Sequence, residues 1–336
     1  MRFFTGFAVF LGLGTVQACE LCGIYSAGSV VGESSQGLIF TVAEQYIPYG
    51  NPMLDGREVT VSNPNFVDSS ITHLIPGFNF SSRFGVSLSV PITYLNFRRS
   101  DVRYSPTAPP VNFTETGSEF GLGDVALIGR ASLVQITSMR YGLVVNFLGG
   151  VKFPTGDSSR IKDEVDQARI FESFLPPGTP HDPLGHSVAS VHAHQLALGS
   201  GSYDGVFGLT MNSRYDRWFF NAQFQYYLRT HGQSGFRFGD EIIISGGPGG
   251  FLFVNDSYTL SLQLNAVYDS MGRDEILGRA SNRTGSTAWY LGPGLNLSIG
   301  EHFSATAGVE FPLHITNNGF QSMPDCRVHG GFSWRF

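Results

Sequence analysis

Apolar and polar residues alternate with a period of two through most of the chain after residue 36. Successive side chains of a β-strand point to opposite faces, so this alternation predicts strands with one apolar and one polar face. The last ten residues repeat the pattern and end the chain on Phe336. The clearest segment sets Trp218, Phe220, Ala222, Phe224, Tyr226 and Leu228 against Asn221, Gln223, Gln225 and Arg229.

About twelve segments are expected to be strands. The connections between them alternate between short ones, such as 81–83 and 135–139, and long ones, such as 48–69, 99–120 and 154–194. Outer-membrane β-barrels have short periplasmic turns and long extracellular loops, whereas a soluble sandwich has no reason to place every long loop at one end. The sequence therefore predicts an all-β fold, an antiparallel transmembrane outer-membrane β-barrel. The expected strands span 37–47, 70–80, 84–98, 121–134, 140–153, 195–211, 216–230, 240–254, 258–270, 287–299, 302–315 and 326–336.

The composition agrees with this fold class. Only 14% of the 336 residues are charged, against about 25% in ordinary soluble domains, and there are 42 Gly and 29 Phe. No stretch of about 20 apolar residues follows the N-terminal segment, which argues against helical membrane spans there. The net charge of −6 argues against a nucleic-acid partner.

The N-terminal region is expected to direct export. Residues 1–18 combine Arg2, an apolar run and a small-residue cleavage site, the pattern of a secretory signal peptide. Residues 19–36 then form a periplasmic segment, and 37–336 the barrel. The segment opens with Cys19 and Cys22, a CxxC pair that suits a local disulfide, acylation of Cys19, or chemistry with a metal or a heme-carrying partner.

The connection 154–194 is the longest of the chain. Asp157 and Ser158 are positioned to cap a short helix, and Pro176 follows its expected end. The segment is either a lid or constriction of the barrel, placed outside it or folded into the lumen, or a solvated surface helix. Apolar residues recur at helical spacing at Ile161, Val165, Ala168, Phe171 and Phe174.

Two further groups of residues suggest chemistry. His192 and His194 would lie on one side of a strand and could bind zinc or copper, although no carboxylate or thiol stands at matching spacing. The other interpretation is a pair of polar residues at the barrel mouth. Ser200 or Ser202 beside these histidines would resemble an esterase pair, but no oxyanion hole or orienting third group is evident.

The positions expected to face the lumen form a mixed polar set. They carry amides and both signs of charge, which suits a hydrated or partly filled interior. About twelve strands place the lumen between the filled eight-stranded barrels and the open porins. These positions are Arg130, Asn146, Lys152, Gln223, Gln225, Arg229, Gln263, Asn265, Asp269, Asn296, Glu310, His314, His329 and Arg335.

Several glycine-rich phrases resemble one family of outer-membrane barrels. These are the stretches 121–130, 149–156, 198–204 and 330–336, with Gly292-Pro-Gly294 and Phe311-Pro-Leu313 in support. They resemble the family named after the meta-pathway of phenol degradation, and the likeness covers most of residues 70–336. The resemblance implies transporters of small, often aromatic or apolar compounds, distantly similar to the fatty-acid transporter FadL. It implies no catalytic residues, and the CxxC segment is not part of it.

Together these features predict an outer-membrane protein of a Gram-negative-type bacterium, embedded in the lipid bilayer. It is expected to act as a passive channel or transporter for a small-molecule substrate, without a cofactor and without enzymatic activity. One alternative is a scaffold for a periplasmic partner, such as a redox protein docked at Cys19 and Cys22. The other is a barrel-embedded esterase or lipase.

Overall fold

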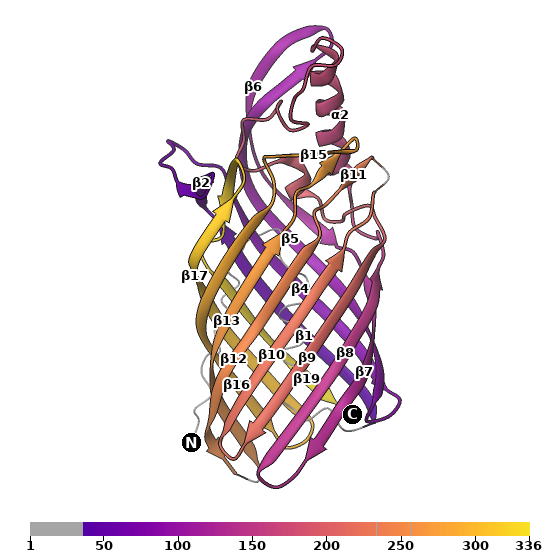
Figure 1. Ribbon diagram of the computed structural model, residues 1–336, viewed down its shortest axis with the longest axis vertical. Coiled ribbons are helices and arrows are strands. Elements are labelled where there is room, and N and C mark those ends of the chain that lie inside the picture. Colours follow the sequence, from indigo (N-terminus) through magenta and orange to yellow (C-terminus); the bar gives the residue numbers. More distant parts are fainter. Residues whose placement is uncertain (1–35, 233, 256) are drawn as a thin grey trace, which may run out of the picture.

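A computed structural model describes residues 36–232, 234–255 and 257–336 and shows one closed barrel (Figure 1). The described residues form a 13-stranded sheet that closes because β4 pairs with both β1 and β5. The ring itself has 12 strands, since the last strand of the sheet, β6 (Ala108–Leu122), pairs only with β5. The ring strands are β1 (Gly37–Tyr49), β4 (Phe66–Asn79), β5 (Phe84–Ser105), β7 (Ala126–Thr137), β8 (Tyr141–Lys152), β9 (Asp204–Tyr215), β10 (Trp218–Leu228), β12 (Glu241–Val254), β13 (Tyr258–Met271), β16 (Ser286–Ile299), β17 (Phe303–Asn317) and β19 (Arg327–Arg335).

The ring is antiparallel and is closed by the two ends of the described chain. β1 pairs with β19, so that Phe40 lies opposite Trp334. Closure satisfies the backbone N–H and C=O groups between neighbouring strands, which is what a bilayer requires of a spanning sheet. The predicted fold class, an antiparallel outer-membrane barrel of about twelve strands, is confirmed.

The outer wall is apolar and carries aromatic residues toward both ends. Leu262 and Leu264 are exposed along β13, in the middle of the wall. Tyr268 packs on Trp289 with ring centroids 4.7 Å apart near one end, and Phe303 lies 6.0 Å from Trp334 near the other. An apolar band between two aromatic girdles is typical of transmembrane barrels.

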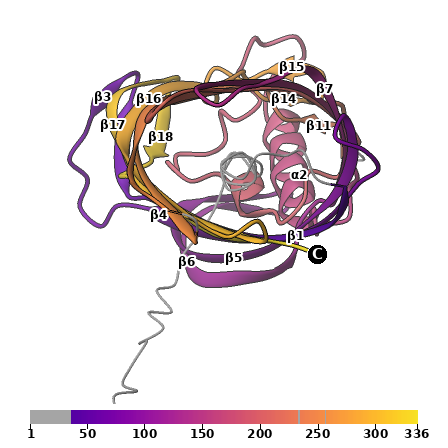
Figure 2. The same cartoon turned by 90° about the horizontal axis from the view of Figure 1, so that it is seen from below.

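Loops of very different length lie at the two ends of the barrel. The C-terminal strand ends beside the short turns, and the long connections gather at the opposite, extracellular end (Figure 1). These connections carry an α-helix, α2 (Ser159–Ser173), which lies within the outline of the ring when the barrel is viewed along its axis (Figure 2). Among the described residues, no helix is long and apolar enough to cross a membrane. The other extracellular elements are β2 (Asn51–Leu54), β3 (Arg57–Glu58), η1 (Ala193–Leu196), β11 (Phe236–Arg237), β14 (Glu275–Ile276), β15 (Arg279–Ala280) and β18 (Phe320–Met323).

One strand of the wall is broken where a continuous strand was expected at 121–134. β6 and β7 pair with β5 one after the other, with Leu122 opposite Ile92 and Ala126 opposite Ser89. Between them Gly123 donates its N–H to the carbonyl of Pro91 at 2.9 Å. Beyond this break β6 leaves the ring and rises beside α2 (Figure 1). The expected loop 99–120 is thus mostly the β5–β6 hairpin.

A β-bulge places His314 on the outer wall, although the alternation had predicted a lumen position. The register between β16 and β17 shifts between Trp289 and Tyr290, so that His314 lies opposite outward-facing Trp289. One extra residue moves all later side chains of a strand to the other face. Ile315 therefore becomes buried and His314 exposed.

The same strand pair offers a test of how tightly the wall is packed. A Cβ added at Gly292 would lie 1.7 Å from the carbonyl oxygen of Val309, whereas one at Gly294 would meet its nearest atom at 3.8 Å. We expect Gly292→Ala to lower the free energy of unfolding by about 1–3 kcal/mol, since the backbone must shift. Gly294→Ala, two residues along β16, should change it by less than about 0.5 kcal/mol. Urea unfolding in lipid vesicles, followed by tryptophan fluorescence, measures both, and equal values would contradict the packing argument.

Candidate functional site: a plugged lumen

The periplasmic half of the lumen holds a polar cavity of about 70 Å³, here called the amide chamber. Strands β9, β10, β12, β13, β16, β17, β19 and β1 all contribute side chains to it. Of the residues predicted to face the lumen, the chamber brings together Gln223, Gln263, Asn265, Asn296, Glu310 and His329. The other lining residues are Gln45, Thr210, Asn212, Asn221, Ala222, Ser245, Gly246, Val267, Gly294, Thr306 and Arg327.

A contiguous cluster of buried apolar residues occupies inward positions on most strands of the ring. This cluster is here called the apolar layer. Sequence analysis did not predict it, because each strand contributes only one or two of its residues, and the neighbouring inward-facing residues on that strand are polar. Its packing narrows this part of the interior, and a cavity remains beside Ala288, Tyr290 and Met323. The members are Met53, Ile75, Ala126, Ile128, Leu148, Val206, Tyr227, Ile243, Val267, Ala288, Tyr290, Ile315 and Met323.

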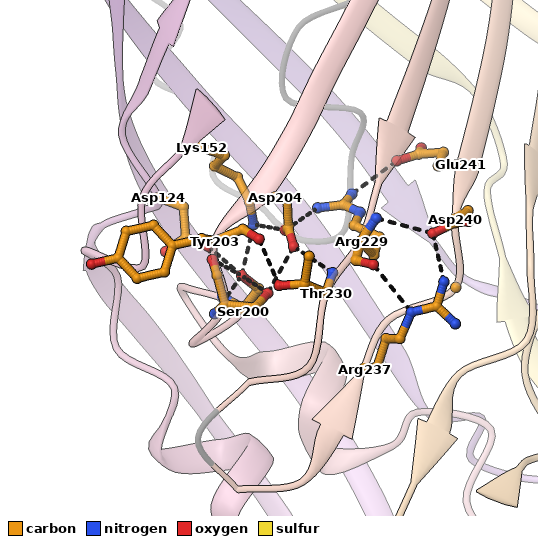
Figure 3. Close-up of polar contacts among 12 residues, drawn as sticks. Asp124, Lys152, Ser200, Tyr203, Asp204, Arg229, Thr230, Arg237, Asp240 and Glu241 are labelled. Atoms are coloured by element: carbon orange, nitrogen blue, oxygen red, sulfur yellow. Dashed lines mark hydrogen bonds and ion pairs between the residues drawn. The ribbon is translucent and has the colours of Figure 1, made fainter. Parts of the chain in front are cut away.

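Lys152 stands at the centre of a buried charge network at the extracellular end of the ring (Figure 3). Its Nζ lies 2.7 Å from Oδ2 of Asp124 and 2.8 Å from Oδ2 of Asp204. Arg229 continues the chain of charges, 3.3 Å from Asp204 and 3.0 Å from Glu241. Alternating signs allow each buried charge to be paired, which burial requires.

The network also holds the serines that suggested an esterase. Ser200 Oγ lies 2.7 Å from Lys152 Nζ and donates to Asp124 at 2.8 Å. Ser202 Oγ donates to Asp204 at 2.9 Å. The side chain of Lys152 is held between the carboxylates of Asp124 and Asp204 and contacts Ser200 as well. In the described part of the chain neither serine is hydrogen-bonded to a histidine, and the geometry is that of a structural clamp.

The segment 154–203, here called the plug, covers the extracellular mouth and is organised around the buried carboxylate of Glu164. Glu164 Oε1 lies 3.0 Å from Nε2 of His186. Its Oε2 accepts hydrogen bonds from the backbone N–H groups of Ala193 and His194. The apolar face of α2, formed by Ile161, Val165 and Ala168, packs against Leu184, Phe236 and Ile276.

Burial and neighbouring charges move the pKa values inside the plug in opposite directions. Burial acts to raise the pKa of Glu164, but hydrogen bonds from His186 and His194 outweigh it and hold the pKa well below its usual value. Burial likewise acts to lower the pKa of His194, yet its contacts with Asp274 and Glu164 raise it to about 9. For His192 burial dominates and lowers the pKa to about 4. The plug is therefore built around one charged and one neutral imidazole.

His192 and His194 do not lie on a strand as the sequence had suggested. The predicted strand 195–211 begins only at Asp204, and residues Ala193–Leu196 form the 3-10 turn η1. The two rings are stacked, with centroids 5.5 Å apart. The residues that the structure describes include no group of three or more metal-ligating side chains suited to a metal ion.

The remaining predicted residues are spread along the barrel. Arg130 donates to Asn79 at 2.9 Å near the periplasmic end, and Asn146 donates to Thr210 at 3.1 Å. Asp269 pairs with Arg327 at 3.2 Å. Two others also point inward: Gln225 accepts a hydrogen bond from Tyr227, and Arg335 lies on the inward face of β19.

Cys19 and Cys22 lie outside the described residues, so the disulfide, lipidation and metal interpretations stay predictions.

Sequence reasoning missed Asp124, Asp204, Glu241 and Glu164. The first three stand at the extracellular ends of ring strands. The alternation of apolar and polar residues stops there, so it does not indicate which way their side chains point.

Comparison with solved structures bears on the fold. An outer membrane channel from Pseudomonas putida F1 is 12% identical and superposes with a TM-score of 0.57, over 90% of this chain and 98% of that chain. The chain is an outer-membrane β-barrel. The beta domain of the Bordetella autotransporter BrkA is 10% identical, with a TM-score of 0.42 over 90% of this chain and 100% of that one. No family model and no curated protein matches the sequence, and membership of the phenol-degradation family stays a prediction.

Removal of the central ammonium should destabilise the barrel strongly. We expect Lys152→Met to lower the free energy of unfolding by about 3–5 kcal/mol, because it leaves buried carboxylates without their partner. Lys162→Met is the matched control, since Lys162 pairs with Asp166 on the exposed side of α2, and its loss should leave the free energy of unfolding nearly unchanged. Urea unfolding in lipid vesicles compares them. A Lys152 variant as stable as the control would contradict the role of the network.

The plug should be most stable near pH 6.5. The raised pKa of His194 means that its contribution is complete below pH 6.5 and is lost as the pH rises through about 9. The lowered pKa of His192 means that its contribution is lost as the pH falls from 6.5 toward about 4. Hydrogen exchange of residues 159–173, corrected for the intrinsic rate at each pH, measures both the alkaline and the acid limb of this pH profile, that is, the loss of plug stability at high pH and at low pH.

Substitutions separate the two limbs of this pH profile. His194→Gln should remove the alkaline limb and His192→Leu the acid limb. His302→Gln, at the periplasmic end of the barrel, should leave both unchanged. A profile that keeps both limbs in the His192 and His194 variants would show that other groups control the plug.

Proposed function

We propose that this protein is an outer-membrane channel for the passive movement of small molecules, closed at its extracellular mouth by the plug. The observation that carries the proposal is a series of three cavities along the lumen. The amide chamber shares Arg327 with a second cavity, which reaches His194 and Gln195 of the plug. The second shares Glu241 and Met271 with a third, which lies against Ser200. Cavities that follow one another inside a closed ring favour the passage of a solute along the barrel axis once the side chains between them move.

Two barriers lie on this route. The first is the apolar layer, because apolar constrictions in channels hinder the passage of water and ions. The second is the plug, which is held by noncovalent contacts alone among the described residues. Arg160 of α2 pairs with Glu115 at 2.8 Å and with Glu119 at 2.5 Å, both on β6. Noncovalent contacts permit α2 and the Glu164 cluster to be displaced while the base of the plug stays anchored on Asp124.

The substrate is defined by the lining of the lumen. The resemblance noted in the sequence implies apolar or aromatic solutes, and Tyr49 and Tyr290 beside the second cavity would suit them. The amide side chains of the chamber favour polar solutes instead. A channel role needs neither a cofactor nor a reactive group.

Excision of the plug is the most direct test of the channel. The N–H of Leu198 already donates to the carbonyl of Asp157 at 2.9 Å. Residues 158–197 can therefore be replaced by Gly-Gly without stretching the chain. We expect the single-channel conductance in a planar bilayer to rise several-fold over the intact protein, because one of the two barriers is gone.

A reversible lock provides the matched control. Ser190 Oγ of the plug lies 2.8 Å from Ser322 Oγ of β18. Ser190→Cys with Ser322→Cys, in a background where Cys19, Cys22 and Cys326 are serine, should form a disulfide that fixes the plug. Oxidation should lower the conductance and reduction restore it. Equal and negligible conductance of the excised, locked and intact proteins, together with no swelling of proteoliposomes in any small neutral solute, would overturn the channel proposal.

A further inference from the structure

We infer that the amide chamber selects small, neutral, polyhydroxylated solutes; this substrate class rests on the proposed channel function. Seven of its 17 lining residues carry a side-chain amide, and three more carry a hydroxyl. No Phe, Tyr or Trp lines it. An amide offers both a hydrogen-bond donor and an acceptor without net charge. A hydroxyl group also donates and accepts, so a ring of amides matches a molecule that presents several hydroxyls.

The acidic and basic side chains that line the chamber already have partners, either in the chamber or beside it. Glu310 accepts a hydrogen bond from Asn265 at 2.7 Å and lies 3.3 Å from His329. Arg327 pairs with Asp269 at 3.2 Å. A charged solute would have to leave water without meeting an unpaired counter-charge, which is costly. The chamber therefore disfavours ions more than neutral polar molecules.

One amide of the chamber has a donor that no described residue satisfies. Nε2 of Gln223 is buried and has no hydrogen-bond partner, and its side chain lines the cavity. Gln223 is 9% exposed. Buried donors in folded proteins almost always have a partner, so this one points to a molecule with an acceptor oxygen in the chamber. An apolar solute would leave it unpaired, and sites of this kind reject analogues that lack the matching polar group.

The size of the chamber limits which polyhydroxylated solutes can bind in it. Its volume of about 70 Å³ exceeds the space that one water molecule needs several times over. Gly246 and Gly294 keep parts of the wall free of side chains. The space suits a polyol of a few carbon atoms rather than an oligosaccharide. The apolar layer then separates this polar chamber from the charged network above it.

Binding can be measured without transport. Saturation-transfer NMR on the detergent-solubilised mature protein would compare four five-carbon compounds: xylitol, 1,5-pentanediol, glutarate and 1,5-diaminopentane. We expect saturable xylitol binding in the millimolar range, and binding of the other three at least about fivefold weaker, because 1,5-pentanediol lacks the three inner hydroxyls and the other two compounds carry charge. Equal binding of xylitol and 1,5-pentanediol, or stronger binding of either ion, would overturn the inference.

Substitutions test whether the site is the chamber. Gln223→Leu should weaken xylitol binding about three- to tenfold, the effect of one lost hydrogen bond. Phe224→Leu, its neighbour on the lipid-facing side of β10, should leave binding unchanged. Asn221→Leu is a second chamber variant, for use if Gln223→Leu does not fold. Undiminished xylitol binding by a folded chamber variant would place the site elsewhere and overturn the inference.

Swelling of proteoliposomes separates this inference from the channel proposal. Xylitol binding with no flux of any solute through the plug-excised protein would overturn the channel and leave the chamber as a binding site. Flux of all four compounds at equal rates, without saturable xylitol binding, would support the channel and overturn the polyol selectivity.

Discussion

The buried ammonium of Lys152 joins four segments of the chain. It lies at the end of β8 and contacts Asp124 at the break between β6 and β7, Ser200 at the end of the plug, and Asp204 at the start of β9. Through Asp204 it also reaches Arg229. An unpaired charge at this depth would be very costly, so the pairing fixes the positions of these segments relative to one another. The extracellular end of the ring and the base of the plug therefore form a single unit.

Closure of the ring satisfies the backbone and leaves the inward side chains free to define distinct layers. The amide chamber, the apolar layer and the Lys152 network are formed by successive inward-facing residues along the same strands. On β10, for example, Gln223 lines the chamber, Tyr227 belongs to the apolar layer, and Arg229, just beyond the strand, joins the network. Because the interior is layered, the polarity of the lumen changes along the barrel axis. Such a lumen differs from a uniform water-filled pore, because a solute must cross environments of opposite preference.

The sequence predicted the barrel because its two strongest signals, a period of two and alternating loop lengths, follow directly from the geometry of a closed antiparallel sheet. It also indicated the apolar face of the plug helix at Ile161, Val165 and Ala168. It could not place His314, since one bulged residue reverses the facing of a strand without changing its composition. Nor could it find Glu164, whose partners His186 and His194 come from a separate turn of the plug. Contacts of this kind depend on how loops fold back, which local periodicity does not encode.

The break in the wall and the plug are held by the same carboxylate. Asp124 follows the point where β6 leaves the ring, and its Oδ1 accepts the N–H of Gly156 at 3.0 Å. Its Oδ2 accepts the N–H of Ser200 at 2.8 Å, so both ends of the plug are anchored on one residue. Gly156 and Gly199 approach so closely that a Cβ on Gly199 would lie 2.6 Å from the Cα of Gly156. Movement of the plug base would therefore disturb Asp124 and, through it, the strand break. Plug and lateral wall are thus mechanically coupled at this point, while α2 and the Glu164 cluster lie farther out and can rearrange with the base in place.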